Sequence, residues 1–280
     1  MNKTKIEWCD MTWNPVTGCL NDCEYCYARK QVKRFEGWDY SSGCVRVNIH
    51  EDKTYIACDT DTHRNWDCES FALEGGGKIA DLKSAYLTER YNAAPYPFGF
   101  IPTFHRYRLS EPAKVKKPQN IFVCSMADLF GDWVPDEWIQ AVFDACNTAP
   151  QHRYLFLTKN PKRYESFDQY MPPNMFFGWT QTGPSNPLLR FFTHHSWHTF
   201  ISIEPLLQGF DEFHIKGLEW VIIGAETGTR KDKIIPKREW IASIVSQCRA
   251  ATKIPIFMKP SLAPIWGEPL IQEYPWKENK

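Results

Sequence analysis

The sequence has 280 residues, a length that predicts about two domains of average size or one large α/β barrel. Hydrophobic residues make up 43% of the chain and charged residues 24%, which excludes a disordered or collagen-like protein. The 33 basic and 33 acidic residues cancel, so any contact with nucleic acid must come from a local basic patch rather than from the overall charge.

The sequence carries no signal that would direct it to a membrane or an oxidising compartment. Its longest apolar stretches, such as residues 220–225, are far too short to cross a bilayer. Residues 1–10 lack the apolar centre of a secretory signal. We therefore expect a cytoplasmic protein without membrane contact, in which ten cysteines favour metal or redox chemistry over disulfides.

The first hundred residues divide into two segments of different character. Residues 5–35 contain a short extended run, a cysteine-rich loop and a predicted helix at about residues 28–35. Residues 36–98 are polar and cysteine-containing and include a run of three glycines, so they are predicted to be an insertion that forms a lid or a substrate-docking element. Alternating residues 45–49 followed by residues 54–57 predict a small hairpin within it.

Beyond residue 118 short apolar runs alternate with helical patterns. Strands are predicted at residues 121–124, 154–157, 175–179, 199–203, 220–223 and 256–258, and helices at residues 136–147, from residue 161, and at residues 239–249. Buried strands that alternate with helices predict an α/β fold with a parallel sheet, and six or seven such units favour a full or partial barrel. We expect residues 1–35 and 99–280 to form this barrel and residues 36–98 to be inserted into it.

Polar residues follow most of the predicted strands, at the edge where parallel barrels place their chemistry. They are Ser125, Asp128, Lys159, Thr180, Gln181, Glu204, Glu226 and Thr227. The alternative explanation is that loops are polar in any protein.

Cys19, Cys23 and Cys26 form a C-x3-C-x2-C motif with Tyr25 directly before the third cysteine. Such close spacing indicates a metal site. Structural zinc needs four ligands, which would require Cys9 or a cysteine of the insertion as the fourth. An iron–sulfur cubane held by three thiolates keeps one iron open for a small molecule, as a catalytic cluster requires.

The motif C-x3-C-x-aromatic-C resembles the signature of the radical S-adenosylmethionine (SAM) superfamily. Further segments are similar to a phage-associated radical SAM family of mostly unassigned function, itself similar to spore photoproduct lyase: residues 13–19, 104–109, 121–130, 157–159, 203–206 and 221–228. The resemblance implies a partial (β/α)6 TIM-like barrel and a 4Fe–4S cluster held by the three cysteines. It also implies reductive cleavage of SAM to a 5′-deoxyadenosyl radical. The insertion, Cys9 and Cys124 depart from the family pattern.

The resemblance also implies residues that bind SAM beside the cluster. The backbone carbonyl of Tyr25 would accept from the adenine amino group, although its side chain could simply pack. Ser125 and Asp128 stand where the family contacts the SAM amino group or ribose.

Further roles fall on the later strand ends. Lys159 resembles the basic residue that pairs with the SAM carboxylate, with a solvated lysine at a helix start as the alternative. Thr180 and Gln181 could contact the ribose or carboxylate. Glu204, expected to be catalytic, and Glu226, expected to bind the cofactor, would point into the barrel mouth, whereas a carboxylate at a helix N-terminus is the competing interpretation of Glu204.

The remaining cysteines allow two explanations each. Cys124 could donate a hydrogen atom to a product radical, or it could be an ordinary core cysteine. Cys44, Cys58 and Cys68, together with Cys9, could hold a second cluster or zinc, but their spacing matches no compact metal motif and they could equally be packing residues.

Histidines form an H-H-x2-H motif at His194, His195 and His198. Two histidines four residues apart can bind a metal from one helix face. Because no carboxylate lies between them, we expect a surface helix instead.

Basic residues cluster at residues 29–34, 106–117 and 230–233, and such clusters can follow a nucleic-acid backbone or merely be solvated. The resemblance implies a radical SAM enzyme, an isomerase, lyase or transferase, that modifies a nucleobase substituent, with a thymine derivative in phage DNA as the expected substrate. It implies a nucleoside or DNA partner and a reductant such as flavodoxin or ferredoxin in a bacterial or phage-infected cell. The alternatives are a peptide or metabolite substrate, or a non-catalytic, zinc-stabilised nucleic-acid-binding protein.

Overall fold

The computed structural model describes residues 1–35, 45–50, 53–58, 68–72, 78–82, 95–96, 98–170, 172–184, 197–212, 216–250 and 253–277. Contacts divide the chain into two compact units. The first comprises Met1–Thr4 and Cys9–His152, and the second comprises Lys5–Trp8 and Arg153–Lys280. The expected insertion, residues 36–98, lies within the sequence range of the first unit.

Three strands of the first unit are hydrogen-bonded in the order β1-β2-β9. They are β1 (Asn2–Lys3), β2 (Met11–Trp13) and β9 (Asn120–Val123). β1 pairs antiparallel with β2, whereas β2 pairs parallel with β9. The parallel pair carries the cysteine loop, which follows β2 and β3, and the polar segment that follows β9.

A second sheet of the same unit has the order β3-β8-β7-β6. Its strands are β3 (Val16–Thr17), β8 (Thr103–His105), β7 (Lys78–Leu82) and β6 (Cys68–Ala72). Two strands of the insertion therefore extend a sheet that begins next to the cysteines. β4 (Val45–His50) and β5 (Lys53–Cys58) pair antiparallel, which confirms the predicted hairpin.

The described residues of the first unit also form three short helical segments and one longer helix. They are α1 (Tyr27–Val32) continued by the 3-10 turn Lys33–Phe35, the 3-10 turn Arg106–Arg108, α2 (Glu111–Lys114), and α3 (Asp136–Asn147). α3 has the predicted bounds, and the predicted apolar positions Trp138, Ile139, Val142, Phe143 and Cys146 are all buried. Its 3.6-residue pattern is strong because one complete face packs into the core.

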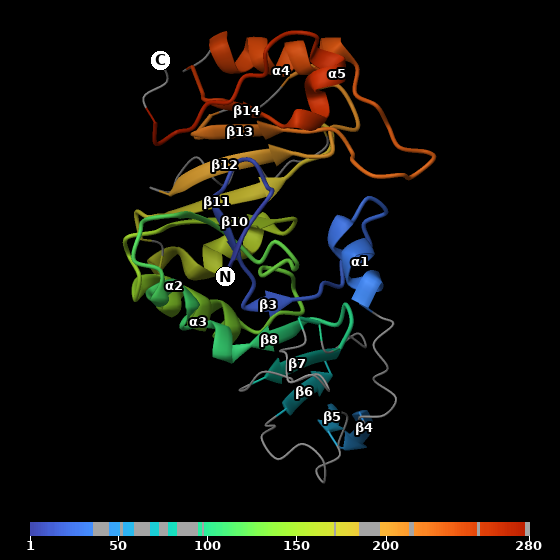
Figure 1. Cartoon of the computed structure of the whole chain (residues 1–280), viewed down its shortest axis with the longest axis vertical. Coiled ribbons are helices and arrows are strands. Elements are labelled where there is room, and N and C mark those ends of the chain that lie inside the picture. The colour runs from blue at the N-terminus through green and yellow to red at the C-terminus, as the bar shows by residue number, and fades with distance from the viewer. Residues whose placement is uncertain are drawn as a thin grey trace. The chain divides into compact units, whose positions relative to one another are not determined.

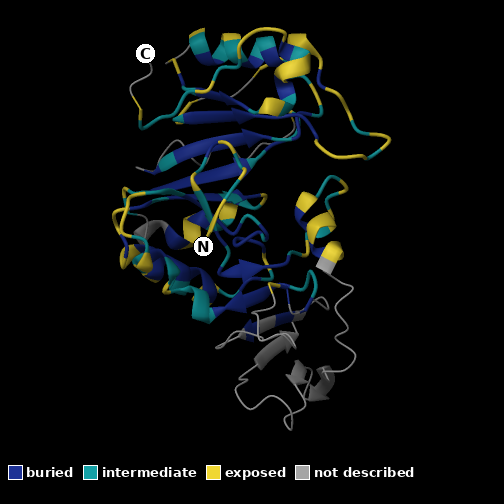
Figure 2. Cartoon of the chain, viewed as in Figure 1, coloured by how far each residue is buried: buried dark blue, intermediate teal, exposed yellow. Residues whose placement is uncertain are grey.

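The second unit contains five parallel strands in the order β10-β11-β12-β13-β14 (Figure 1). They are β10 (Arg153–Thr158), β11 (Met175–Thr180), β12 (His198–Ile203), β13 (Trp220–Ile223) and β14 (Ile256–Met258). Most of their residues are buried, as the dark blue strands of Figure 2 show. This explains why they read as continuous apolar runs rather than as alternating ones.

The 3-10 segment Pro161–Tyr170 connects β10 with β11, and α4 (Arg238–Ala250) connects β13 with β14. The 3-10 turn Pro260–Leu262 and α5 (Ala263–Trp266) follow β14. α4 buries Ile241, Ile244 and Cys248, in agreement with the predicted amphipathic helix. The exposed segment between β13 and α4 is among the largest yellow regions in Figure 2.

The α/β class with mostly parallel strands is confirmed. The expected helix around the histidine motif is wrong at His198, which begins β12 and pairs with Glu219 at 2.8 Å. His194 and His195 lie outside the described residues. Among the helices that are described, none has the length and apolar character needed to span a membrane.

Candidate functional site

The cysteine loop leaves β3 through a glycine that the backbone requires. Gly18 has φ +82°, and a Cβ there would lie 2.2 Å from the carbonyl oxygen of Ile101. The Gly18 amide donates to the carbonyl of Met126 at 2.9 Å, and the Cys19 amide donates to Phe100 at 3.2 Å. The first cysteine is therefore held between the segment before β8 and the segment after β9.

Backbone amides point at two of the three sulfur atoms. Cys19 Sγ accepts from the amide of Asn21 at 3.4 Å, and Cys26 Sγ accepts from the amide of Arg29 at 3.3 Å, where Cys26 caps the N-terminus of α1. N–H donors to sulfur are also found around the cysteine ligands of iron–sulfur clusters. Cys19, Cys23 and Cys26 are partly exposed, and no described cysteine forms a disulfide.

The donor set fits an iron–sulfur cluster in composition, because it offers three thiols that are close in the sequence and N–H donors to two of the sulfur atoms. The described side chains do not, however, include three His, Cys, Asp or Glu residues gathered as a metal site. The loop would therefore have to bring its sulfur atoms together when a cluster binds.

The helix after the cysteines is anchored to the segment after β9. Ala28 and Val32 of α1 pack against Tyr96 and Met126, with Cys26 beside them. The hydroxyl of Tyr27 donates to the carbonyl of Ser125. Tyr25, expected to contact adenine through its carbonyl, is partly exposed in the turn between Cys23 and Cys26.

Ser125 and Asp128 lie beside the cysteine loop. Ser125 Oγ donates to Asn14 Oδ1 at 3.2 Å, and the same oxygen accepts from the Met126 amide at 3.0 Å. Asp128 Oδ2 accepts from Asn21 Nδ2, a residue of the cysteine loop, at 3.1 Å. The structure thus places Ser125 and Asp128 beside the segment that carries Cys19, Cys23 and Cys26, through the bonds to Tyr27 and Asn21.

Cys124 directly follows β9 and has an unusual backbone conformation. Its φ is +57°, in the left-handed region, and its side chain is 3% exposed. Burial raises the pKa of its thiol to about 12, partly opposed by a hydrogen bond from the backbone of Val16. The thiol therefore keeps its proton at neutral pH, as both a hydrogen-atom donor and a core residue would.

In the second unit, Lys159 directly follows β10, and Thr180 is the last residue of the neighbouring strand β11. Lys159 is exposed and precedes the 3-10 segment that begins at Pro161, and Thr180 is partly exposed. Gln181 is 5% exposed and donates from Nε2 to the carbonyl of Gly183 at 2.9 Å. Its Oε1 is buried and has no hydrogen-bond partner, which is costly for a polar atom and marks a position where a ligand donor fits.

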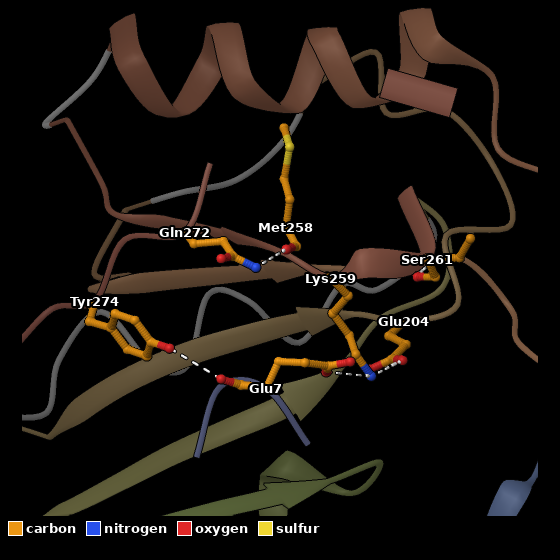
Figure 3. A network of polar contacts seen from close by, with 8 residues as sticks. Glu7, Glu204, Met258, Lys259, Ser261, Gln272 and Tyr274 are labelled. Carbon is orange, nitrogen blue, oxygen red and sulfur yellow. Dashed lines mark hydrogen bonds and ion pairs between the residues drawn. The ribbon is translucent and has the colours of Figure 1, made fainter. Parts of the chain in front are cut away.

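Glu204, directly after β12, forms an ion pair that the sequence analysis did not find (Figure 3). Lys259 Nζ, directly after β14, donates to Glu204 Oε1 at 2.5 Å. Glu7 Oε2 lies 4.0 Å from the same nitrogen. No helix begins at Glu204, so its interpretation as a carboxylate at a helix N-terminus is wrong.

Glu226 follows β13 with its side chain 2% exposed, in a two-point pair with Arg230. Arg230 Nε donates to Oε1 at 2.8 Å and its Nη2 donates to Oε2 at 2.7 Å. Any ligand that Glu226 contacts must share it with this guanidinium.

Several polar contacts of the site had no signal in the expected motifs. Asn21 connects the cysteine loop to Asp128, and Asn14 orders the segment after β9. Lys259 could have been selected by the same rule as Glu204, because it follows a buried strand. Glu7 had no such signal. Cys9 is partly exposed, whereas Cys44 and the side chains of Cys58 and Cys68 lie outside the described residues, so the second metal site stays a prediction.

Comparison with known proteins identifies a family but no function. A family model described as "Protein of unknown function (DUF5131)" matches residues 3–73 and 79–269. No curated protein and no solved structure matches the chain. Because the family model covers most of the sequence, the chain belongs to the DUF5131 family of proteins of unknown function.

Proposed function

We propose that this protein is a radical SAM enzyme that modifies a thymine-derived nucleobase, either in DNA or as a nucleoside. The observation that carries the proposal is the C-x3-C-x2-C loop, whose cysteines are partly exposed and two of whose sulfur atoms accept backbone N–H bonds. These features suit thiolate ligands. The chain would be a partial (β/α)6 barrel, as the resemblance to that superfamily implies.

Cys19, Cys23 and Cys26 would hold the 4Fe–4S cluster, and the cluster would supply the electron that cleaves SAM reductively. The residues around the loop have supporting roles. Asp128 and Asn21 order the loop through their hydrogen bond at 3.1 Å. The Ser125 hydroxyl and the Tyr25 carbonyl would bind the polar groups of SAM.

The strand ends of the second unit would contact the cofactor and substrate. Lys159 would pair with the SAM carboxylate, and Thr180 and Glu226 would accept hydrogen bonds from its polar groups. Glu204 would contact the substrate. Cys124 would serve as hydrogen-atom donor, a role that requires the protonated thiol its burial maintains.

Metal content after anaerobic reconstitution tests the cluster assignment. We expect about four irons per chain in the wild type. Cys19→Ser, Cys23→Ser and Cys26→Ser should each lose most of the iron. Cys9→Ser is the matched control, because Cys9 is also partly exposed but lies outside the motif. Zinc in place of iron, lost also in Cys9→Ser, would instead support the zinc-stabilised binding protein.

Product analysis with different additives tests the substrate. SAM cleavage under dithionite should be stimulated by thymidine or by thymine-containing DNA. Stimulation by a peptide alone would support radical chemistry on another substrate class.

A further inference from the structure

Three strand ends of the second unit place Glu204, Gly224 and Lys259 side by side. The Gly224 amide donates to the carbonyl of Ile203 at 3.0 Å, and the Lys259 amide donates to the carbonyl of Ile223 at 2.9 Å. Lys259 directly follows β14, and its side chain reaches past the end of β13 to Glu204, which directly follows β12. A Cβ on Gly224 would lie 3.0 Å from Lys259 Cδ and 3.2 Å from Glu204 Cδ, so the pair lies close against the glycine.

The carboxylates around Lys259 outnumber its single charge. Besides Glu204 at 2.5 Å, Glu7 lies 4.0 Å from the ammonium, as the dashed lines of Figure 3 show. The segment with Glu7 is held within the same unit, because the Tyr274 hydroxyl donates to the Glu7 carbonyl at 3.2 Å and Trp8 packs against Trp220. The three groups carry a formal charge of −1, which disfavours a phosphate and favours a ligand that donates hydrogen bonds.

Glu204 has one engaged oxygen and one available oxygen. Oε1 accepts from Lys259, while Oε2 has no hydrogen bond within the described part of the chain, and the side chain is 26% exposed. On the neighbouring strand, the buried Oε1 of Gln181 likewise has no partner. Adjacent strand ends therefore offer two acceptors without donors, whereas the nearby ammonium is already shared between carboxylates.

We propose that Glu204 Oε2 accepts a hydrogen bond from a neutral N–H or O–H group of the nucleoside, and that Lys259 is the positioning residue that fixes this carboxylate. The inference rests on the proposed function and adds how its substrate is recognised. Two groups of thymidine share the required chemistry, namely the imide N3–H of the base and the 3′-hydroxyl of the sugar.

The test is equilibrium binding of thymidine to the full chain, measured by titration calorimetry with melting temperatures as the folding check. Glu204→Gln places an amide donor where the open acceptor stands, and it should weaken binding about tenfold, as expected for one lost hydrogen bond. Lys259→Met should weaken thymidine binding by a similar factor, whereas Lys259→Arg, which keeps the positive charge, should bind thymidine nearly as tightly as the wild type. Glu219→Gln is the matched control, because Glu219 pairs with His198 rather than with this cluster.

Analogues identify the donor. N3-methylthymidine lacks the imide N–H, and 2′,3′-dideoxythymidine lacks the 3′-hydroxyl. One of them should bind the wild type about tenfold more weakly than thymidine, and Glu204→Gln should lose that discrimination. If thymidine binds but Glu204→Gln and Lys259→Met bind it as tightly as the wild type, the inference is wrong while the proposed function stands. If thymidine does not bind the wild type, the nucleoside substrate and the inference both fail.

Discussion

Asn21 and Asp128 are 107 residues apart in sequence, yet Asn21 Nδ2 donates to Asp128 Oδ2 at 3.1 Å. This bond connects the cysteine loop with the segment after β9. Asp128 Oδ1 also accepts from the amide of Phe130 at 3.2 Å, and the residue is 6% exposed. A single buried carboxyl group therefore orders both segments of the candidate site.

Asp128→Ala should reduce the free energy of unfolding by about 2 kcal/mol, because it leaves buried donors without an acceptor. Urea denaturation measures this loss, and reconstituted iron should fall with it if the loop holds a cluster. Asp144→Ala is the control: Asp144 is exposed and accepts from Gln140, so its loss should change stability by less than about 0.5 kcal/mol. Equal effects of the two variants would contradict the role of Asp128.

Gly18→Ala should be more harmful than an alanine at another glycine of similar conformation. At Gly18 both the φ of +82° and the carbonyl of Ile101 oppose a Cβ, whereas Gly99 has φ +60° and open space. Gly99→Ala should cost about 1 kcal/mol of backbone strain, and Gly18→Ala should cost at least about 2 kcal/mol. Similar denaturation midpoints for both variants would show that the close approach at Gly18 is not maintained in solution.

The buried thiol of Cys124 predicts a loss of stability at alkaline pH. Its pKa rises from 9.0 to about 12 on folding, because burial disfavours the thiolate. The unfolded chain therefore releases this proton at lower pH than the folded chain. The contribution of Cys124 is complete below about pH 9 and is lost as pH rises toward about 12.

The free energy of unfolding should therefore fall less between about pH 8 and about pH 10 in Cys124→Ala than in the wild type. Parallel pH dependences would show that Cys124 is not buried as described. The same variant tests the hydrogen-atom donor, since full turnover to normal product without the thiol would assign Cys124 to packing alone.

A basic surface follows the cysteines, and the proposed function predicts that an acidic reductant would dock there. Lys30, Lys33 and Arg34 are exposed on α1 and the turn that follows it, within eight residues of Cys26 along the chain. Reversing all three charges to Glu should reduce flavodoxin-driven SAM cleavage about tenfold and weaken its salt dependence, because complementary charge accelerates encounter.

Dithionite-driven cleavage by this triple variant should stay at the wild-type rate, because dithionite needs no docking surface. The matched control reverses Lys114, Lys116 and Lys117, three exposed lysines around α2 of the same unit. If both triple variants reduce flavodoxin-driven cleavage equally, the effect is one of net charge and not of this surface.

The elements that could be predicted from sequence are those with a complete local pattern. α3 and β13 have the predicted bounds, because a full apolar face or a short buried run defines them without distant information. The helix expected from residue 161 is instead a series of 3-10 turns, Pro161–Tyr170. His198 was assigned to a surface helix by its spacing to His194, whereas it is the first residue of the strand that was predicted to begin one residue later, at Thr199.

The site shows the same division between local and distant information. The spacing of the three cysteines is a local pattern that can be recognised in the sequence, and so are the polar residues that follow most of the predicted strands. The pairing of Lys259 with Glu204 spans 55 residues and depends on β13 lying between their strands, which no local pattern encodes. The left-handed conformation of Cys124 was also unpredictable, since cysteine rarely adopts it.

Formation of 5′-deoxyadenosine tests the central claim most directly. The anaerobically reconstituted full chain, incubated with SAM and dithionite, should contain about four irons and release 5′-deoxyadenosine, whereas the Cys19→Ser, Cys23→Ser and Cys26→Ser variants should release none. A wild-type protein that stays colourless, takes up no iron and leaves SAM intact under these conditions would contradict the account.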